Sequence, residues 1–313
     1  MKKYFYLAAA AITLVACNQK EMENDGVQEP KVINLTASIN SGEDVTRASS
    51  ADALQNVAFV TGKEIFVEAY ETGESSTYTT GTYTTAAAGA LTPPLGGMYY
   101  PADNGAIDLC AYYPASISSS SENFTVSNAQ TSEANYQASD LMYATKLTNK
   151  SSAPEDQPHN LTFNHALAKI VVNIVAGDGL TDANITTAPR VTAVYINNTV
   201  REATLSISGG VITASKKTTG EPAPSASNIN ILGTGLSNEG IIVPQTVAAG
   251  TFITVVYNGD DEHYTYALPE AKTFVAGKVY TYTLTLKARS VELTATTITD
   301  WDPQTGGTKD ITI

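Results

Sequence analysis

Apolar and polar residues alternate along many short stretches of this chain, and this alternation predicts β-strands. In "KEIFVEAY" every second residue from Ile65 to Ala69 is apolar. In "KVYTYTLTLK" the tyrosines and leucines from Tyr280 to Leu286 alternate with threonines, which indicates a half-buried antiparallel strand with one apolar and one threonine face. "AKIVVNIVAG" and "TFITVVYNG" are apolar almost throughout, as expected of strands that are buried more completely.

Turns separate these stretches at short intervals. Signals such as "TGKE", "PPLGG", "ADNG" and "NGDD" recur along the chain, and no run of a dozen residues has a helical period. The enrichment in Thr, Val, Ile and Tyr also favours strands. We therefore expect an all-β fold made of β-sandwich domains.

The first residues are typical of an export signal. "MKKYFYLAAAAITLVAC" has two lysines and then an apolar run from Tyr4 to Ala16, which is shorter than the roughly 20 residues that span a bilayer. Leu14 and Ala16 before Cys17 resemble a bacterial lipobox, which implies cleavage before Cys17 and lipidation of its sulfur. The alternative is an ordinary signal peptide with a chance cysteine. The polar, acidic stretch after Cys17 is typical of a flexible tether.

Composition and charge exclude several classes of function. The formal net charge of −13 and the pI near 4.6 argue against nucleic-acid binding, which needs clustered Lys and Arg, and suit an extracellular surface. The three histidines have no Cys or His at metal-ligand spacing, and the pairs Asp260-Asp261 and Asp300/Asp302 lack calcium-loop spacing. Phosphate and dinucleotide motifs are missing too. We expect no enzyme activity, cofactor or metal.

Three single residues carry structural expectations. Cys110 in "AIDLCAYYP" lies in an apolar strand pattern and is expected to be a buried core residue. His165 is expected to be a hydrogen-bonded residue at a domain join. Trp301, the only tryptophan, is either a packing anchor at the end of a strand or a platform for stacking a sugar.

Arginine is scarce, and its first occurrence follows a predicted strand. Only four arginines occur, and the first, in Arg47-Ala48, comes shortly after an apolar and polar alternation from Val32 to Ile39. The intervening residues are small and polar, so an arginine-specific protease can enter there. The predicted strand is thus separable from the rest of the chain by one cut.

An ordered set of phrases resembles the fimbrillin family, the subunits of type V pili. The phrases are "LCAYYP", "DLMYAT", "LTFNHALAKIVVNI", "GIIVPQTV", "FVAGKVYTYTLTLK" and "ITDWDP". The resemblance implies two tandem transthyretin-like Greek-key β-sandwich domains, export as a lipoprotein and maturation by cleavage after Arg47. It further implies polymerisation by strand exchange, in which a strand of another subunit fills the groove that the removed strand leaves.

These observations predict five segments and a set of partners. The segments are a signal peptide (1–16), an acidic tether (17–31), a removable strand (32–47), an N-terminal sandwich (48–165) and a C-terminal sandwich (166–313). The expected partners are other fimbrial subunits, the outer membrane through the lipid before maturation, and a host protein or glycan receptor.

The C-terminal tail is the expected donor of the exchanged strand. Val291 and Leu293 alternate in "SVELTATTITDW", together with Ala295, and Ile311 and Ile313 alternate at the end of the chain. For residues 291–298 the alternative is that they complete their own domain. Two other functions stay open: a surface lipoprotein that binds glycan or protein without polymerising, and a pilus anchor subunit that keeps its lipid.

Overall fold

The computed structural model describes residues 30–40, 58–152, 157–187, 190–218, 227–231, 233, 235–258, 262–287 and 290–301. Within them the chain is almost entirely β, which confirms the predicted class. The strands are β1 (Leu35–Ile39), β2 (Glu64–Glu71), β3 (Thr77–Thr85), β4 (Ala90–Thr92), β5 (Ile107–Tyr113), β6 (Asn123–Thr125), β7 (Met142–Ala144), β8 (Leu147–Lys150), β9 (His159–His165), β10 (Ala168–Ala176), β11 (Val191–Thr199), β12 (Glu202–Ser208), β13 (Val211–Lys216), β14 (Ser227–Asn230), β15 (Ser237–Ile242), β16 (Gln245–Val247), β17 (Gly250–Tyr257), β18 (Glu262–Leu268), β19 (Lys272–Phe274), β20 (Lys278–Lys287) and β21 (Ser290–Asp300). The helices are α1 (Glu133–Ala138), α2 (Asp182–Thr186) and a 3-10 turn, η2 (Ala87–Gly89).

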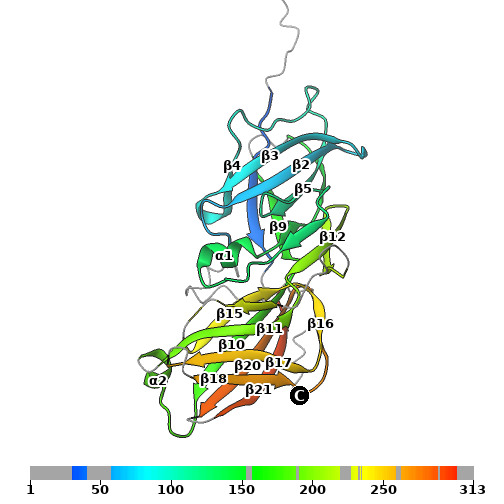
Figure 1. Ribbon diagram of the computed structural model, residues 1–313. Coiled ribbons are helices and arrows are strands. Elements are labelled where there is room, and N and C mark those ends of the chain that lie inside the picture. Colours follow the sequence, from blue (N-terminus) through cyan, green and yellow to red (C-terminus); the bar gives the residue numbers. More distant parts are fainter. Residues whose placement is uncertain are drawn as a thin grey trace, which may run out of the picture.

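The first large sheet closes on itself. Its strand order is β2-β3-β4-β1-β9-β7-β5-β8, and β2 also pairs with β5. The ring therefore consists of β2, β3, β4, β1, β9, β7 and β5 in this order, and β8 pairs with β5 at its side (Figure 1). A closed sheet has no open edge that could pair with another chain. Loss of any one strand of the ring would create such an edge.

Two four-stranded sheets form the second part of the molecule (Figure 1). Their orders are β15-β10-β20-β21 and β14-β11-β17-β18. Apolar side chains from both sheets, such as Val172 and Leu284 from one and Ile196 and Val255 from the other, belong to one buried cluster. This is the packing of a β-sandwich.

Strand β20 alternates as predicted, but its pairing is mixed. Its tyrosines and leucines are buried, while the threonines between them are half-buried. It pairs antiparallel with β21 but parallel with β10. The prediction of an antiparallel strand was therefore wrong for one of its two neighbours, because alternation reports which face is buried and not the direction of the partner.

A smaller sheet joins the two parts. β6, which lies between two ring strands in sequence, pairs with β12 in the order β13-β12-β6. Close by, the side chain of Gln130 exchanges two hydrogen bonds of 2.8 Å with the backbone of Ile241. Residues from the N-terminal half thus pack with the second part, and the expected domain boundary at His165 stays a prediction, although the last ring strand ends there.

Strand β5 is buried along its whole length because both of its faces are covered. Ile107 and Leu109 face the core inside the ring, whereas Cys110 and Tyr112 belong to the larger cluster outside it. Gly210, in the turn between β12 and β13, lies so close that a Cβ there would come within 2.8 Å of the Cys110 sulfur. Cys110 is therefore a buried core residue, as predicted.

Candidate functional site

Strand β1 lies between two ring strands that are distant from it in sequence. It runs parallel to β9, with Leu35 opposite His159 and Ile39 opposite Phe163. On its other side it runs antiparallel to β4, with Leu35 opposite Leu91. Since β4 and β9 do not pair with each other, β1 is the strand that closes this side of the ring.

Every second side chain of the β1 segment is buried inside the ring. The inward residues are Ile33, Leu35, Ala37 and Ile39, with exposed fractions of 0, 3, 9 and 6%. The buried hydroxyl of Tyr83 donates a hydrogen bond of 2.7 Å to the carbonyl of Ile33. The alternation predicted for residues 32–39 is therefore the alternation of a strand whose inner face forms part of the ring core.

The outward side chains of β1 form polar contacts with β9. Thr36 donates to the Asn160 carbonyl oxygen (3.2 Å), and the Asn160 amide donates to Ser38 (2.9 Å). One residue past the strand, the Asn40 amide donates to Asn164 (3.0 Å). These contacts specify the register, because a slip by one residue would turn the apolar face of β1 outward.

A glycine makes room for the backbone of β1. Gly89, in η2, has a φ of 75°, and a Cβ at this position would lie 2.5 Å from the carbonyl oxygen of Ala37. Gly96 has a similar φ of 93° but nothing within 4 Å of its Cβ position. Gly89 is therefore required both by the turn and by the close approach of β1, whereas Gly96 is required by its turn alone.

The chain leaves β1 and returns to the ring at the same place. One cavity of about 510 Å³ is lined by Ser38, near the end of β1, and by Phe59, the second residue of the next described segment. The Phe59 ring makes edge contacts with Tyr113 and Phe163. Residues 41–57, which include Arg47 and Ala48, connect these two points and lie outside the described residues, as does Cys17.

The donor candidates in β21 pair with their own chain. Val291 and Leu293 are half-buried and pack against the larger core, while β21 pairs with β20 along its length. A register shift between Thr283 and Leu284 makes Thr294 an extra residue, so Ala295 is exposed and does not continue the expected alternation. The other two candidates, Ile311 and Ile313, lie outside the described residues.

Trp301 fixes the end of β21 at the join between the two parts. It is buried, and its ring stacks on that of His165 with centroids 3.6 Å apart. His165 in turn makes a 2.8 Å contact with the Asp140 carboxylate, and the Lys169 ammonium lies 5.7 Å from the indole centroid. The structure confirms that Trp301 is a packing anchor and that His165 is a hydrogen-bonded residue; a buried indole offers no face to a sugar.

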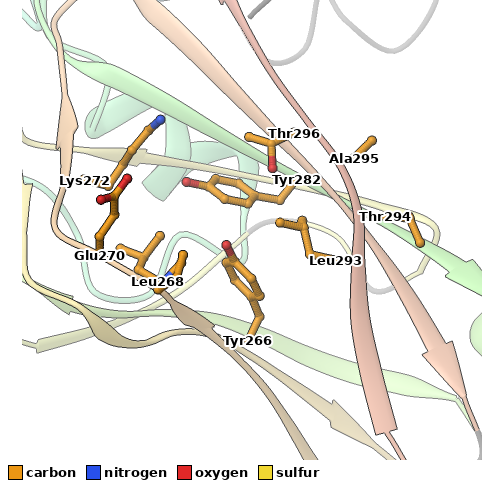
Figure 2. A pocket seen from close by; sticks show the side chains of 10 residues that line it. Tyr266, Leu268, Glu270, Lys272, Tyr282, Leu293, Thr294, Ala295 and Thr296 are labelled. Atoms are coloured by element: carbon orange, nitrogen blue, oxygen red, sulfur yellow. The ribbon is translucent and has the colours of Figure 1, made fainter. Parts of the chain in front are cut away.

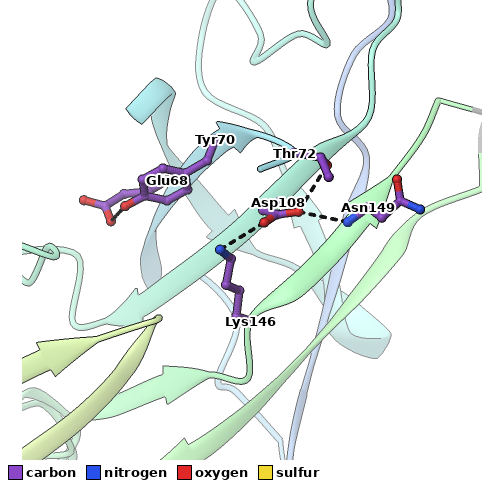
Figure 3. Close-up of polar contacts among 6 residues, drawn as sticks. All are labelled: Glu68, Tyr70, Thr72, Asp108, Lys146 and Asn149. Carbon is purple, nitrogen blue, oxygen red and sulfur yellow. Dashed lines mark hydrogen bonds and ion pairs between the residues drawn. The ribbon is translucent and has the colours of Figure 1, made fainter. Parts of the chain in front are cut away.

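A polar cluster lies on the outer face of β2, β5 and β8 (Figure 3). Asp108 accepts from the Lys146 ammonium at 3.0 Å, from the Thr72 hydroxyl at 3.1 Å and from the Asn149 N–H at 2.9 Å. Burial alone would raise the pKa of Asp108, but the bonds from Asn149 and Lys146 outweigh it and the pKa is lowered. Burial raises the pKa of the neighbouring Cys110 thiol to about 11, which makes it a poor nucleophile.

Neither a metal site nor a membrane-spanning helix is found in the described part of the chain. It contains no group of three or more His, Cys, Asp or Glu side chains that could hold a metal ion. None of its helices combines the length and hydropathy needed to cross a membrane.

The residues that receive β1 had no signal of their own in the sequence. Tyr83, Gly89 and Asn160 stand in segments whose pairing partner is far away in the chain. β4 has only three residues, too few for a pattern. An unpaired apolar strand followed by a protease site indicated that a receiving groove should exist, but not which strands form it.

Known proteins share both the sequence and the fold. Residues 46–301 match the model of a family described as fimbrillin-like. Fim1C, a candidate fimbrium subunit of Bacteroides uniformis, is 33% identical over 218 residues, which are 67% of this chain and 66% of that relative, just under two thirds of its length.

Solved structures agree with this assignment. A candidate cell adhesion protein of Bacteroides uniformis has a TM-score of 0.60 and 26% identity, with 86% of this chain and 98% of that chain covered. Another from Bacteroides ovatus has a TM-score of 0.65 at 21% identity, with 88% and 100% covered, which is a likeness of fold. Since the family model covers most of the sequence, the chain belongs to the fimbrillin-like family.

Proposed function

We propose that this protein is a structural subunit of a cell-surface fimbria, that it is exported as a lipoprotein through Cys17, matured by cleavage after Arg47, and polymerised by strand exchange in support of adhesion. The observation that carries the proposal is the position of β1. It closes the ring between β4 and β9, and one cut at Arg47 would detach it from the ring that it closes.

Loss of β1 would convert a closed sheet into an acceptor. The backbone groups of β4 and β9 that now pair with β1 would become free, and the apolar space left by Ile33, Leu35 and Ile39 would open to water. Such a groove is the kind of edge that folded proteins keep covered. A strand from a second subunit would restore both the backbone bonds and the burial, which is β-augmentation between chains.

The uncut precursor would resist this exchange for two reasons. In the precursor, β1 belongs to the same chain as the groove that it fills, so its effective concentration there is on the order of millimolar or higher. β1 also offers three large inward side chains and an alanine, whereas the tail offers Ile311 and Ile313. At about 1.5–3 kcal/mol for each large side chain that is fully buried, the resident strand is favoured. A donor succeeds only after the cut segment has left.

The segment after Trp301 is the better donor of the two candidate stretches. β21, with Val291 and Leu293, pairs with β20 along its length except at the bulge at Thr294, and Trp301 is buried at its end. Donation of β21 would break that pairing and expose part of the larger core. Donation of the residues that follow, including Ile311 and Ile313, would break no pairing among the described strands of the sandwich. The resulting contact is heterologous and does not close, so it would propagate as a filament.

Cleavage of the purified chain tests the proposal. The full chain with Cys17→Ser, which prevents lipidation, is digested with an arginine-specific protease and followed by native electrophoresis and electron microscopy. We expect filaments from this protein and monomers from the same protein with Arg47→Ala. Polymer from the Arg47→Ala variant would exclude the loss of β1 as the step that starts polymerisation. A cleaved protein that loses β1 and stays monomeric would favour a surface-binding or anchor protein instead.

A further inference from the structure

A cavity opens between the edge strands β18 and β21, away from β1. Its volume is about 180 Å³, and its floor and walls include Tyr282 from β20, Leu268 and Tyr266 from β18, and Leu293 from β21 (Figure 2). Glu270 and Lys272, from the segment after β18, project at one side. The edge strands β18 and β21 of the two sheets have no backbone pairing with each other.

The bulge in β21 shapes one wall of this cavity. The extra residue, Thr294, turns its hydroxyl to the carbonyl of Thr283 at 3.1 Å, and Ala295 and Thr296 follow along the wall. A bulge redirects side chains at a sheet edge and often lies next to a binding site. Without the shift, the alternation of β21 would place different side chains beside Leu293.

The floor of the cavity holds a buried hydroxyl that has no partner. Tyr282 is 1% exposed, and its hydroxyl makes no hydrogen bond with any described residue. Tyr280, two residues earlier on the same strand, accepts from the Val275 N–H at 2.9 Å and donates to the Thr273 carbonyl. Burial raises the pKa of Tyr282, so its hydroxyl stays a neutral donor. In Figure 2 it points to the side where Glu270 and Lys272 lie.

The lining combines ring faces with groups of both charge signs. The Tyr266 and Tyr282 ring centroids are 5.8 Å apart, and the planes are inclined by 50°. Glu270 and Lys272 make no ion pair with another described residue. A ligand that suits this lining has an apolar face for the rings and hydroxyls that can both donate to a carboxylate and accept from an ammonium or a phenol.

Size narrows the class of ligand further. A cavity of about 180 Å³ has room for one small ring and not for a peptide segment. A ligand with a net charge would meet one opposite and one like charge at the rim. We propose that this cavity binds a single neutral pyranose ring, such as the terminal sugar of a glycan. The proposal goes beyond the structural role of the subunit and requires neither cleavage nor strand exchange.

Binding is tested with the full chain carrying Cys17→Ser and the methyl pyranosides of glucose, galactose, mannose, fucose and N-acetylglucosamine. Saturation-transfer NMR detects binding, and titrations followed by two-dimensional NMR spectra of the protein measure the dissociation constants. For one ring in a small cavity, we expect at least one sugar to bind with a dissociation constant on the order of 1–10 mM.

Three variants locate the site. Tyr282→Phe and Glu270→Gln should each weaken binding by about ten-fold, since the first removes one hydrogen bond to the sugar and the second replaces a charged acceptor by a weaker neutral one. Glu292→Gln, an exposed acid on β21 outside the cavity, is the matched control and should change binding less than about two-fold. Tyr282→Phe should also leave the Tm unchanged or higher, because it removes an unpaired buried hydroxyl, which separates lost binding from lost folding.

Several outcomes would overturn this proposal. One is that no sugar of the panel binds at a concentration on the order of 10 mM. Another is binding that neither cavity variant weakens, which would place the sugar elsewhere. Binding of N-acetyltyrosine amide in place of the sugars would assign the cavity to a protein side chain. None of these results bears on filament formation, which is measured separately.

Discussion

At the scale of single residues, close backbone approaches hold β1 in place as much as apolar burial does. The Tyr83 hydroxyl contacts the Ile33 carbonyl, and Gly89 leaves space for the Ala37 carbonyl. Neither contact gives β1 a stronger strand pattern in the sequence. Both contacts fix how deeply the backbone of β1 lies in the groove. The backbone of an incoming strand would have to lie at the same depth.

Gly89 and Gly96, which both have a positive φ, allow a matched test of this close approach. Gly96→Ala should lower the free energy of unfolding by about 1 kcal/mol, the strain of an alanine at positive φ. Gly89→Ala should lower it by more, because its Cβ would also displace Ala37, and should speed hydrogen exchange in β1 in particular. Chemical denaturation and hydrogen exchange measure both effects. Equal losses for the two variants would show that the backbone of β1 yields without cost.

The Asp108 cluster makes stability depend on pH in a stated direction. The pKa of Asp108 is lowered below its ordinary value of 3.8, so its ionised form stabilises the fold above about pH 4, and this contribution is lost as the pH falls through the lowered pKa. Asp108→Asn should cost about 1–2 kcal/mol at pH 7, less than for a fully buried pair because Lys146 is partly exposed.

The same difference should shrink toward zero as the pH falls through the lowered pKa of Asp108. Urea denaturation at several pH values measures it, with Asp103→Asn, an exposed carboxylate in a nearby turn, as the control. A penalty for Asp108→Asn that stays constant from pH 7 to pH 2 would mean that packing, and not charge, explains the effect.

At the scale of elements, the sequence predicted strands well and their partners poorly. β20 alternates because one of its faces lies in a core, and a face is a local property that five to ten residues reveal. Leu35 pairs with His159, and such a contact depends on how the ring closes, which no local pattern records. Strand β1 was predictable because a short alternation is local, whereas its removal by a cut at Arg47 stays a prediction. The strands β4 and β9 that receive β1 were not predictable.

The bulge in β21 shows the same limit in one element. Val291, Leu293 and Ala295 alternate in sequence, yet Ala295 is exposed because Thr294 is an extra residue relative to β20. Nothing in "LTATT" distinguishes a bulge from a regular strand. The cavity beside this bulge was therefore beyond prediction, while the anchoring role of Trp301 was one of two interpretations considered.

If exchange requires β1 to leave, an added β1 peptide should oppose it. A peptide of residues 31–40, present when the cleaved protein begins to polymerise, should bind the vacant groove and shorten or prevent filaments. The same peptide with Leu35→Ser and Ile39→Ser keeps the backbone and loses two large buried side chains, each worth about 1.5–3 kcal/mol, so it should fail. Light scattering measures growth. Equal inhibition by both peptides would exclude the groove as their target.

At the scale of the whole molecule, the acceptor and the proposed donor belong to different parts. β1 is in the ring, whereas β21, which precedes the proposed donor, is in the sandwich (Figure 1). A subunit can therefore lose one function and keep the other. The buried contact of Trp301 with His165 fixes the end of β21, so the proposed donor segment would begin at a defined point.

This separation predicts a chain terminator. A cleaved subunit that lacks residues 308–313 keeps its groove and loses the donor isoleucines, so it should accept a strand and offer none. Alone it should stay monomeric, and its Tm should match that of the intact cleaved subunit, since the deleted residues follow the anchored end of β21. Mixed with intact cleaved subunits, it should shorten filaments in proportion to its fraction, because each incorporated copy ends one chain. Electron microscopy of filament lengths against mixing ratio measures this. As a control, the truncated subunit with Arg47→Ala, still carrying β1, should not shorten filaments at any ratio. Filaments from the truncated subunit alone would show that the donor lies before residue 308, and would return β21 with Val291 and Leu293 to first place.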